Sequence, residues 1–303
     1  GPNRDTTALF LSYEFAGSNY LMTHTLNTIL VSLAVAIELS KIMEKKLTEP
    51  NIANDIKKVV ICSRKIFTKK QLIEIGIAAL LHDMYFKEAI PNLDKTYKFS
   101  LKEQSIIEKH PAEAFHYLKQ NLPLLDFEVT KAVYQHHEYL DGSGFPTGVE
   151  GRLFSRYSPV LSFAVHYVEH TTENPFHQMK HPHIVFNSMM TKLRRKFDDD
   201  LLLAFARGSG IFPLGSWVLL NTGHIGVVFR NNPQAPRNPV VRAVLDKTFQ
   251  RINPIDFNTA EGQARIYHPV PFSEVKKRVP NYKEVLFAGE TLPSPYVSDA
   301  ENS

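Results

Sequence analysis

The chain has 303 residues, of which 43% are hydrophobic and 22% are charged, so a disordered protein is excluded and a sizeable core is expected. The formal net charge of +4 suits an anionic small-molecule ligand and is too low for a protein that binds a nucleic-acid polymer. One cysteine, Cys62, excludes an internal disulfide framework and indicates a reducing cytoplasm.

The first predicted helix covers residues 19–47, where Leu26, Leu33 and Ile37 follow helical spacing. Its longest aliphatic run, residues 29–37, is too short to span a bilayer, so no membrane span is expected. Residues 1–18 are assigned to a leader, since the opening Gly-Pro resembles the scar left by a protease.

Two capping boxes predict the next helix starts. Thr68 and Gln71 have the spacing of a box and open an apolar run that leads into His82 and Asp83. The same spacing recurs at residues 100 and 103, which open a helix expected to run to residue 110. Pro111 then predicts the first turn of a fresh helix.

Asp126 is a predicted N-cap for a helix over 127–140, which places His136 and His137 in its last turns. Residues 141–148 must form a loop, because three glycines and a proline will not continue a helix.

The remaining chain changes character near residue 211. Helices are expected up to residue 207, with Asp198–Asp200 at a helix N-terminus. The residues that follow alternate in the way of strands, with a hairpin turn at Asn221–Gly223. We therefore predict a helical domain over 19–210, a small β-rich extension over 211–270 and a poorly ordered tail over 271–303.

Eight of the thirteen histidines lie between residues 24 and 170, on successive predicted helices. Metal sites in helical bundles are assembled from inward-facing side chains of different helices, and imidazole with carboxylate suits iron, manganese, zinc or nickel. Taken singly, a histidine such as His24 or His110 is more often an ordinary surface or core residue. The adjacent pair His136 and His137 together with the His82-Asp83 pair favours a metal site.

Three motifs carry a family resemblance: "LLHD" at 80–83, "KHP" at 109–111 and "HHEYLDGSGFPTG" at 136–148. They resemble the HD-GYP family, helical metal-dependent phosphodiesterases that cleave cyclic di-GMP in bacteria. The resemblance covers residues 15–207 and implies a mainly α fold, an HD-domain helical bundle, with the small β-rich C-terminal extension that many members carry.

The resemblance also implies a binuclear metal site. Carried over to this chain, its ligands are His24, His82, Asp83, His110, His136 and His137. Asp83 would bridge two divalent transition metals, with iron or manganese favoured and zinc or nickel as alternatives. Asp83 and His82 would then be the catalytic residues.

One family ligand is missing. An aspartate is expected on the helix after the loop, and ungapped alignment puts Val165 at its position. His166, Glu169 and His170 are candidate replacements on the same helix. A glutamate that holds a third metal in some members is Tyr20 here, so a trinuclear site is not expected.

The positions that bind substrate also depart from the family. The family lysine after the His-Asp pair is Phe86, although Lys87 follows it, and the tyrosine of the signature is Phe145. In the family, basic residues hold the ligand phosphates; at their positions this chain has Asn174 and His177. Lys87, Asn174 and His177 are the candidate substrate-binding residues.

These observations leave three functions open. The leading prediction is a cytoplasmic hydrolase of cyclic di-GMP or a related cyclic dinucleotide, with signalling proteins as partners. The losses at Phe86, Phe145, Val165 and Asn174 favour the second, a catalytically degenerate member that acts as a metal or nucleotide sensor or interaction module. The third is an HD-type phosphohydrolase that acts on another nucleotide.

Overall fold

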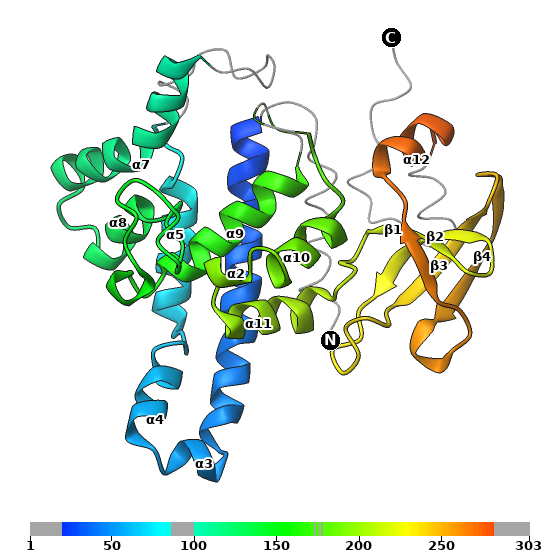
Figure 1. Ribbon diagram of the computed structural model, residues 1–303, viewed down its shortest axis with the longest axis horizontal. Helices are drawn as coiled ribbons and strands as arrows, with labels where there is room; N and C mark the ends of the chain where they lie inside the picture. The colour runs from blue at the N-terminus through cyan, green and yellow to red at the C-terminus, as the bar shows by residue number, and fades with distance from the viewer. Residues whose placement is uncertain (1–19, 86–99, 173, 175, 177, 282–303) are drawn as a thin grey trace. The chain divides into compact units, whose positions relative to one another are not determined.

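The computed structural model describes residues 20–85, 100–172, 174, 176 and 178–281, and the predicted leader over 1–18 lies outside them. The chain divides into two compact units, residues 1–214 and 215–303. The first unit is helical and the second is built on an antiparallel sheet, so the predicted fold class, mainly α with a small β-rich extension, is confirmed (Figure 1).

The first unit is a bundle of helices. Its α-helices are α2 (Tyr20–Leu47), α3 (Pro50–Ala53), α4 (Ile56–Ser63), α5 (Lys69–Leu81), α7 (Leu101–Asn121), α8 (Phe127–Tyr134), α9 (Ser158–Thr171), α10 (Pro182–Met190) and α11 (Asp199–Ser209). The predicted capping boxes at Thr68 and Ser100 are both formed. Asp126 and Asp198 cap α8 and α11, as their positions in the sequence indicate.

Helix α2 is the core helix of this bundle and packs against α5, α9 and α11 (Figure 1). Its buried face carries Val31, Val35 and Leu39, whereas Leu26 and Ile37, which follow helical spacing, are 41% and 38% exposed. The helix carries apolar residues on both sides, so helical spacing alone does not select its buried side. By length and composition α2 could cross a membrane, yet 56% of its apolar window is buried inside the protein.

Two predicted helix boundaries also differ. Residues on both sides of Pro111 form one continuous helix, α7, rather than two. Helix α8 ends at Tyr134 instead of running to residue 140. It ends early because the loop after it folds back, so that the Phe145 amide donates to the His137 carbonyl at 3.2 Å.

The second unit contains a five-stranded antiparallel sheet in the order β4-β3-β2-β1-β5. The strands are β1 (Trp217–Leu220), β2 (His224–Arg230), β3 (Val240–Asp246), β4 (Arg251–Asn258) and β5 (Ile266–Pro269). The predicted turn joins β1 to β2, and Gly223 adopts a φ of 84°, which favours glycine. Trp217, Ile225 and Leu245 form its buried core.

The tail does not begin at residue 271 as expected. Phe272–Arg278 forms a helix, α12, and Val275 and Val279 are buried in the core of the sheet unit. Burial of these apolar side chains stabilises a helix that propensity alone would leave marginal. Residues 282–303 of the predicted tail lie outside the described residues.

Candidate metal centre

The structure gathers the six predicted ligands at one place in the bundle. One histidine lies in the first turns of α2, the His-Asp pair lies at the end of α5, another histidine lies within α7, and the adjacent pair directly follows α8. They form two groups, each with ligand atoms within 4.8 Å of one another: His24, His82 and Asp83, and His110, His136 and His137.

The Asp83 carboxylate lies between these two groups. Its Oδ2 atom is 3.5 Å from Nε2 of His24 and 3.3 Å from Nε2 of His82. Its Oδ1 atom is 3.2 Å from Nε2 of His110 and 3.7 Å from Nε2 of His136. Each carboxylate oxygen therefore faces a different group, which is the arrangement of a carboxylate that bridges two cations.

Backbone carbonyls orient three of the imidazole rings. Nδ1 lies 2.7 Å from the Ala79 carbonyl oxygen in His82, and 2.6 Å from the Val133 carbonyl oxygen in His136. Both carbonyls belong to the last turn of a helix, where they have no intrahelical donor. A carbonyl can only accept, so Nδ1 must carry the proton, and the lone pair of Nε2 is directed into the centre.

Pro111 gives His110 the same orientation in the middle of a helix. In an uninterrupted helix the amide of residue 111 would donate to the carbonyl of Ile107, but proline has no N–H. The freed carbonyl accepts instead from Nδ1 of His110 at 2.5 Å. This side-chain bond explains both why α7 continues through the proline and why Nε2 of His110 points at Asp83.

Burial sets the ionisation of the centre. It lowers the pKa of His24 to about 4 and that of His137 to about 3, so both imidazoles are neutral at pH 7. Burial alone would raise the pKa of Asp83, but the surrounding histidines hold it well below its usual range. Burial alone would lower the pKa of His82, and the Asp83 carboxylate raises it instead. Neutral imidazoles around an ionised carboxylate are the protonation states that a metal ion requires.

A buried nitrogen of His82 supports a cation in this place. Among the described residues, Nδ1 of His24 and Nε2 of His82 have no hydrogen-bond partner. A buried polar atom without a partner costs about 1–3 kcal/mol, a cost that a bound metal would remove at His82 by accepting the lone pair. The donor set therefore fits divalent transition metals, and the absence of thiolates among these residues is unlike a structural zinc site.

The loop after α8 is fixed by Glu138, which is fully buried. Its Oε1 atom accepts from the Thr147 amide at 2.8 Å, the Thr147 hydroxyl at 2.8 Å and the Gly148 amide at 3.1 Å. Sequence reasoning did not single out Glu138 or the orienting role of Pro111. The position of Glu138, an acidic residue between the histidine pair and a glycine-rich loop, could have indicated its role. For Pro111, the signal was that it follows Ile107 by four residues, the spacing of a helical hydrogen bond.

The signature loop closes directly on the histidine pair. A Cβ on Gly144 would overlap the carbonyl of His137, so only glycine fits there. The ring of Phe145 stacks on that of His137, with centroids 4.5 Å apart. Phenylalanine thus retains the packing of an aromatic residue against the centre, without a hydroxyl group to donate.

Helix α9 does not supply a ligand at the expected position. Val165 is 2% exposed and packs in the apolar core. Nδ1 of His166 lies 3.0 Å from the Tyr139 hydroxyl, and its ring packs on Phe197. Nδ1 of His170 lies 2.9 Å from the His166 carbonyl.

The substrate-binding candidates are only partly described. Asn174 closes the turn after α9: its amide nitrogen donates to the carbonyls of Glu169 at 2.6 Å and Thr172 at 3.0 Å. Phe86, Lys87 and His177 lie outside the described residues. A role in substrate binding stays a prediction for all of them.

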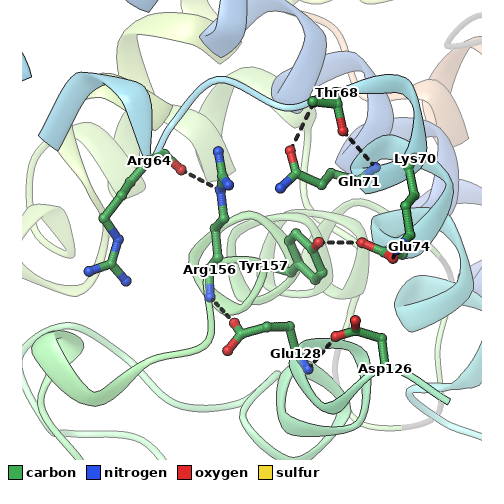
Figure 2. Close-up of a pocket in the computed structure, with 9 residues that line it drawn as sticks. All are labelled: Arg64, Thr68, Lys70, Gln71, Glu74, Asp126, Glu128, Arg156 and Tyr157. Carbon is green, nitrogen blue, oxygen red and sulfur yellow. Dashed lines mark hydrogen bonds and ion pairs between the residues drawn. The ribbon is translucent and has the colours of Figure 1, made fainter. Parts of the chain in front are cut away.

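A second polar cluster lies at the other ends of α5, α8 and α9. Figure 2 shows Arg156 and Tyr157 at its centre. The Arg156 guanidinium donates to the carbonyls of Ser63, Arg64 and Ile66 at 3.0, 2.7 and 2.5 Å. We call this cluster the brace pocket; it is lined by Arg64, Thr68, Lys70, Gln71, Glu74, Asp126, Glu128, Arg156 and Tyr157.

The carboxylates of the brace pocket are paired within the protein. The Tyr157 hydroxyl donates to Glu74 at 2.5 Å, and the Arg156 amide donates to Glu128 at 2.7 Å (Figure 2). Asp126 accepts from the Glu128 amide at 2.8 Å as the N-cap of α8. These bonds connect the starts of three helices, so we interpret the pocket as a structural feature that stabilises the bundle.

Comparison with known proteins agrees with the motifs. The family model of the HD domain matches residues 38–201, and the model described as a KOW domain associated with HD domain matches residues 217–264. A cyclic di-GMP phosphodiesterase of Pseudomonas aeruginosa is 27% identical over 193 residues, which are 61% of this chain and 46% of that protein. The chain therefore spans less than half of the length of this relative.

Among solved structures, an HDG"Y"P protein from Bdellovibrio bacteriovorus matches 60% of this chain and 50% of its own. The two are 20% identical, with a TM-score of 0.42.

Proposed function

This chain belongs to the HD domain family, and we propose that it is a metal-dependent phosphodiesterase that hydrolyses cyclic di-GMP or a related cyclic dinucleotide at a binuclear site. The observation that carries the proposal is the position of Asp83, whose two oxygens face two separate histidine groups. We infer iron or manganese as the metals, since imidazole and carboxylate together suit both.

His24 and His82 would hold one metal and His110, His136 and His137 the other, with Asp83 shared. Two bound cations supply an activated water nucleophile at neutral pH and neutralise charge on the phosphodiester oxygens. Burial lowers the pKa of His24, His136 and His137 and so favours their neutral form, and backbone carbonyls orient the rings of His82, His110 and His136. The ring of Phe145 covers one face of the His137 ring.

The substrate class rests on three supports. The relative from Pseudomonas aeruginosa is named as a cyclic di-GMP phosphodiesterase, and the signature loop of this chain keeps its two tightly placed glycines, Gly142 and Gly144. The formal net charge of +4 suits a dianionic ligand.

A second function, a metal-binding sensor without turnover, is favoured by one specific observation. Asn174, at the position of a phosphate-binding residue in the resemblance, is held by the backbone carbonyls of its own turn. A chain without this phosphate contact could bind metal and hydrolyse a cyclic dinucleotide slowly or not at all. An HD-type phosphohydrolase for another nucleotide is the third candidate.

The test uses the whole chain, reconstituted without oxygen with Mn²⁺ or Fe²⁺. Metal content is measured, and cyclic di-GMP and cyclic di-AMP are then incubated separately and the products resolved by chromatography. We expect two metals per chain and hydrolysis that falls at least about a hundredfold in Asp83→Ala, with metal content falling in parallel. Asp199→Ala, an exposed aspartate on α11, is the matched control and should behave as wild type.

Stoichiometric metal without turnover of either nucleotide would favour the sensor. Hydrolysis that persists in Asp83→Ala would contradict the proposed site.

A further inference from the structure

The ring of His137 is oriented differently from the other rings of its group. His110 and His136 each direct Nδ1 to a backbone carbonyl, whereas no carbonyl of the described residues accepts from the ring of His137. His137 stacks instead on the ring of Phe145, with centroids 4.5 Å apart and an interplanar angle of 24°. Its ring contacts with His110 and His136 are contacts between proposed ligands. Phe145 is therefore the aromatic neighbour from outside the ligand set.

This stacking contact fixes a torsion that is otherwise soft. The χ2 angle of a histidine has a broad energy minimum, so an imidazole without a hydrogen bond on Nδ1 turns easily about it. A second ring held nearly parallel to the imidazole restricts that rotation, because turning would break the stacked contact. A ligand that is held in one orientation binds its metal more tightly than one that is free to turn.

Phe145 keeps its position because the loop that carries it is tied to the residues at and beside the ligand. The Phe145 amide donates to the His137 carbonyl at 3.2 Å. Beyond Phe145, Oε1 of Glu138 accepts from the amides of Thr147 and Gly148 at 2.8 and 3.1 Å, and from the Thr147 hydroxyl at 2.8 Å. Glu138 directly follows His137 and is fully buried. The loop is therefore anchored on both sides of Phe145.

One oxygen of Glu138 makes the whole anchor. Oε1 accepts all three of these hydrogen bonds, whereas Oε2 is buried and has no hydrogen-bond partner within the part of the chain that the structure describes. The anchor thus requires an acceptor oxygen at this place, and the side-chain carbonyl of a glutamine offers one as well. Alanine offers none.

We propose that Glu138 is a positioning residue of the metal centre. It anchors the signature loop, residues 141–148, and the anchored loop holds the ring of Phe145 against His137 and so orients this ligand. Stacking needs only the ring, so phenylalanine serves here as well as tyrosine would. The inference rests on the proposed binuclear site and concerns metal binding, not the choice of nucleotide.

The test is a double-mutant cycle that reads metal binding directly, without substrate. Wild type, Glu138→Ala, Phe145→Leu and the double variant are reconstituted with Mn²⁺ without oxygen and titrated by calorimetry. We expect each single variant to bind one of the two metals at least about tenfold more weakly. The double variant should bind it no more than about threefold more weakly than the weaker single variant, because both substitutions break the same series of contacts.

Conservative variants separate positioning from general damage to the fold. Glu138→Gln keeps the acceptor oxygen and Phe145→Tyr keeps the ring, so both should bind two metals within about threefold of the wild-type affinity. Glu150→Ala, an exposed glutamate just after the same loop, is the matched control and should be unchanged. Thermal melts of the metal-free proteins show which variants are folded. If Glu138→Ala is unfolded, Phe145→Leu against Phe145→Tyr decides.

Two results would overturn the proposal. One is wild-type metal affinity in folded Glu138→Ala or in folded Phe145→Leu. The other is a double variant whose loss is the product of the two single losses, since residues that act independently give that result.

The outcomes also separate this proposal from the proposed function. A wild-type chain that binds two metals, shows the expected coupling of Glu138 to Phe145 and hydrolyses no cyclic dinucleotide contradicts the function and supports the positioning role. A wild-type chain that binds no metal overturns both.

Discussion

The two ends of α5, α8 and α9 differ in whether their polar groups find hydrogen-bond partners within the protein. At the starts of these helices, in the brace pocket, Arg156 and the carboxylates of Glu74 and Glu128 have partners within the protein (Figure 2). At the other end, His24 and His82 each keep a buried nitrogen with no hydrogen-bond partner among the described residues. A polar cluster whose hydrogen bonds are all made within the protein stabilises the fold, whereas buried polar atoms without a partner indicate a site for a ligand.

Metal removal should give the largest change in stability. It acts at the end of the helices that contains the proposed metal centre. At free metal of about a thousand times the dissociation constant, binding adds about 4 kcal/mol to the free energy of unfolding. For a helical unit of this size that corresponds to about 10 °C in melting temperature. Thermal melts of the reconstituted chain with and without a chelator measure the shift.

Asp83→Ala is the control for metal removal. Its melting temperature should be the same with and without chelator, since it lacks the shared ligand. An equal shift in this variant would show that the chelator acts elsewhere.

Arg156→Ala tests the contribution of the brace pocket to stability. The carbonyls of Ser63, Arg64 and Ile66 would lose their donor, and the free energy of unfolding should fall by about 2 kcal/mol, because water can replace the donor at the two exposed carbonyls. Metal content after reconstitution should stay at the wild-type value. Arg64→Ala removes an exposed guanidinium from the same pocket and should change stability by no more than about 0.5 kcal/mol. Loss of metal in folded Arg156→Ala would mean that the two ends are not separate.

Pro111→Ala should affect stability and metal binding in opposite directions. Alanine restores an amide that competes with His110 for the Ile107 carbonyl. The ring of His110 is then less firmly oriented, and metal affinity should fall about tenfold in a calorimetric titration. The metal-free chain should become more stable, by up to about 3 kcal/mol, because proline is costly inside a helix. An unchanged affinity would show that the freed carbonyl is not needed.

The helix starts could be predicted because each depends on local chemistry. Thr68 and Ser100 cap their helices through residues three positions away. The hairpin turn ending at Gly223 was predictable for the same reason, since a positive φ selects glycine. Five of the six proposed ligands lie in three short motifs, whereas His24 lies in none of them and was placed by the family resemblance alone; the ligand role of all six stays a prediction.

Features that depend on distant partners could not be predicted. Periodicity could not show that α2 buries Val35 rather than Ile37, because the helix is apolar on both sides. The course of α7 through Pro111 depends on one side-chain bond from His110 to Ile107.

The smallest expected effect is at Asp200, which pairs with two lysines and lines neither the metal centre nor the brace pocket. Its carboxylate accepts from Lys46 and from Lys65, both at 2.6 Å. Burial alone would raise the pKa of Asp200, but the two lysines lower it below its usual range. A lowered pKa stabilises the fold above the unfolded pKa, and the contribution is lost as pH falls through the folded pKa.

Asp200→Asn should therefore lower the free energy of unfolding by about 1 kcal/mol at pH 7, a value kept small because the pair is partly open to solvent. The difference from wild type should begin to close as pH falls below about 4. Urea unfolding of both chains between pH 7 and pH 3 measures it, with exposed Asp199→Asn as the control. A difference of the same size at pH 3 and pH 7 would show that the carboxylate acts through packing and not through its charge.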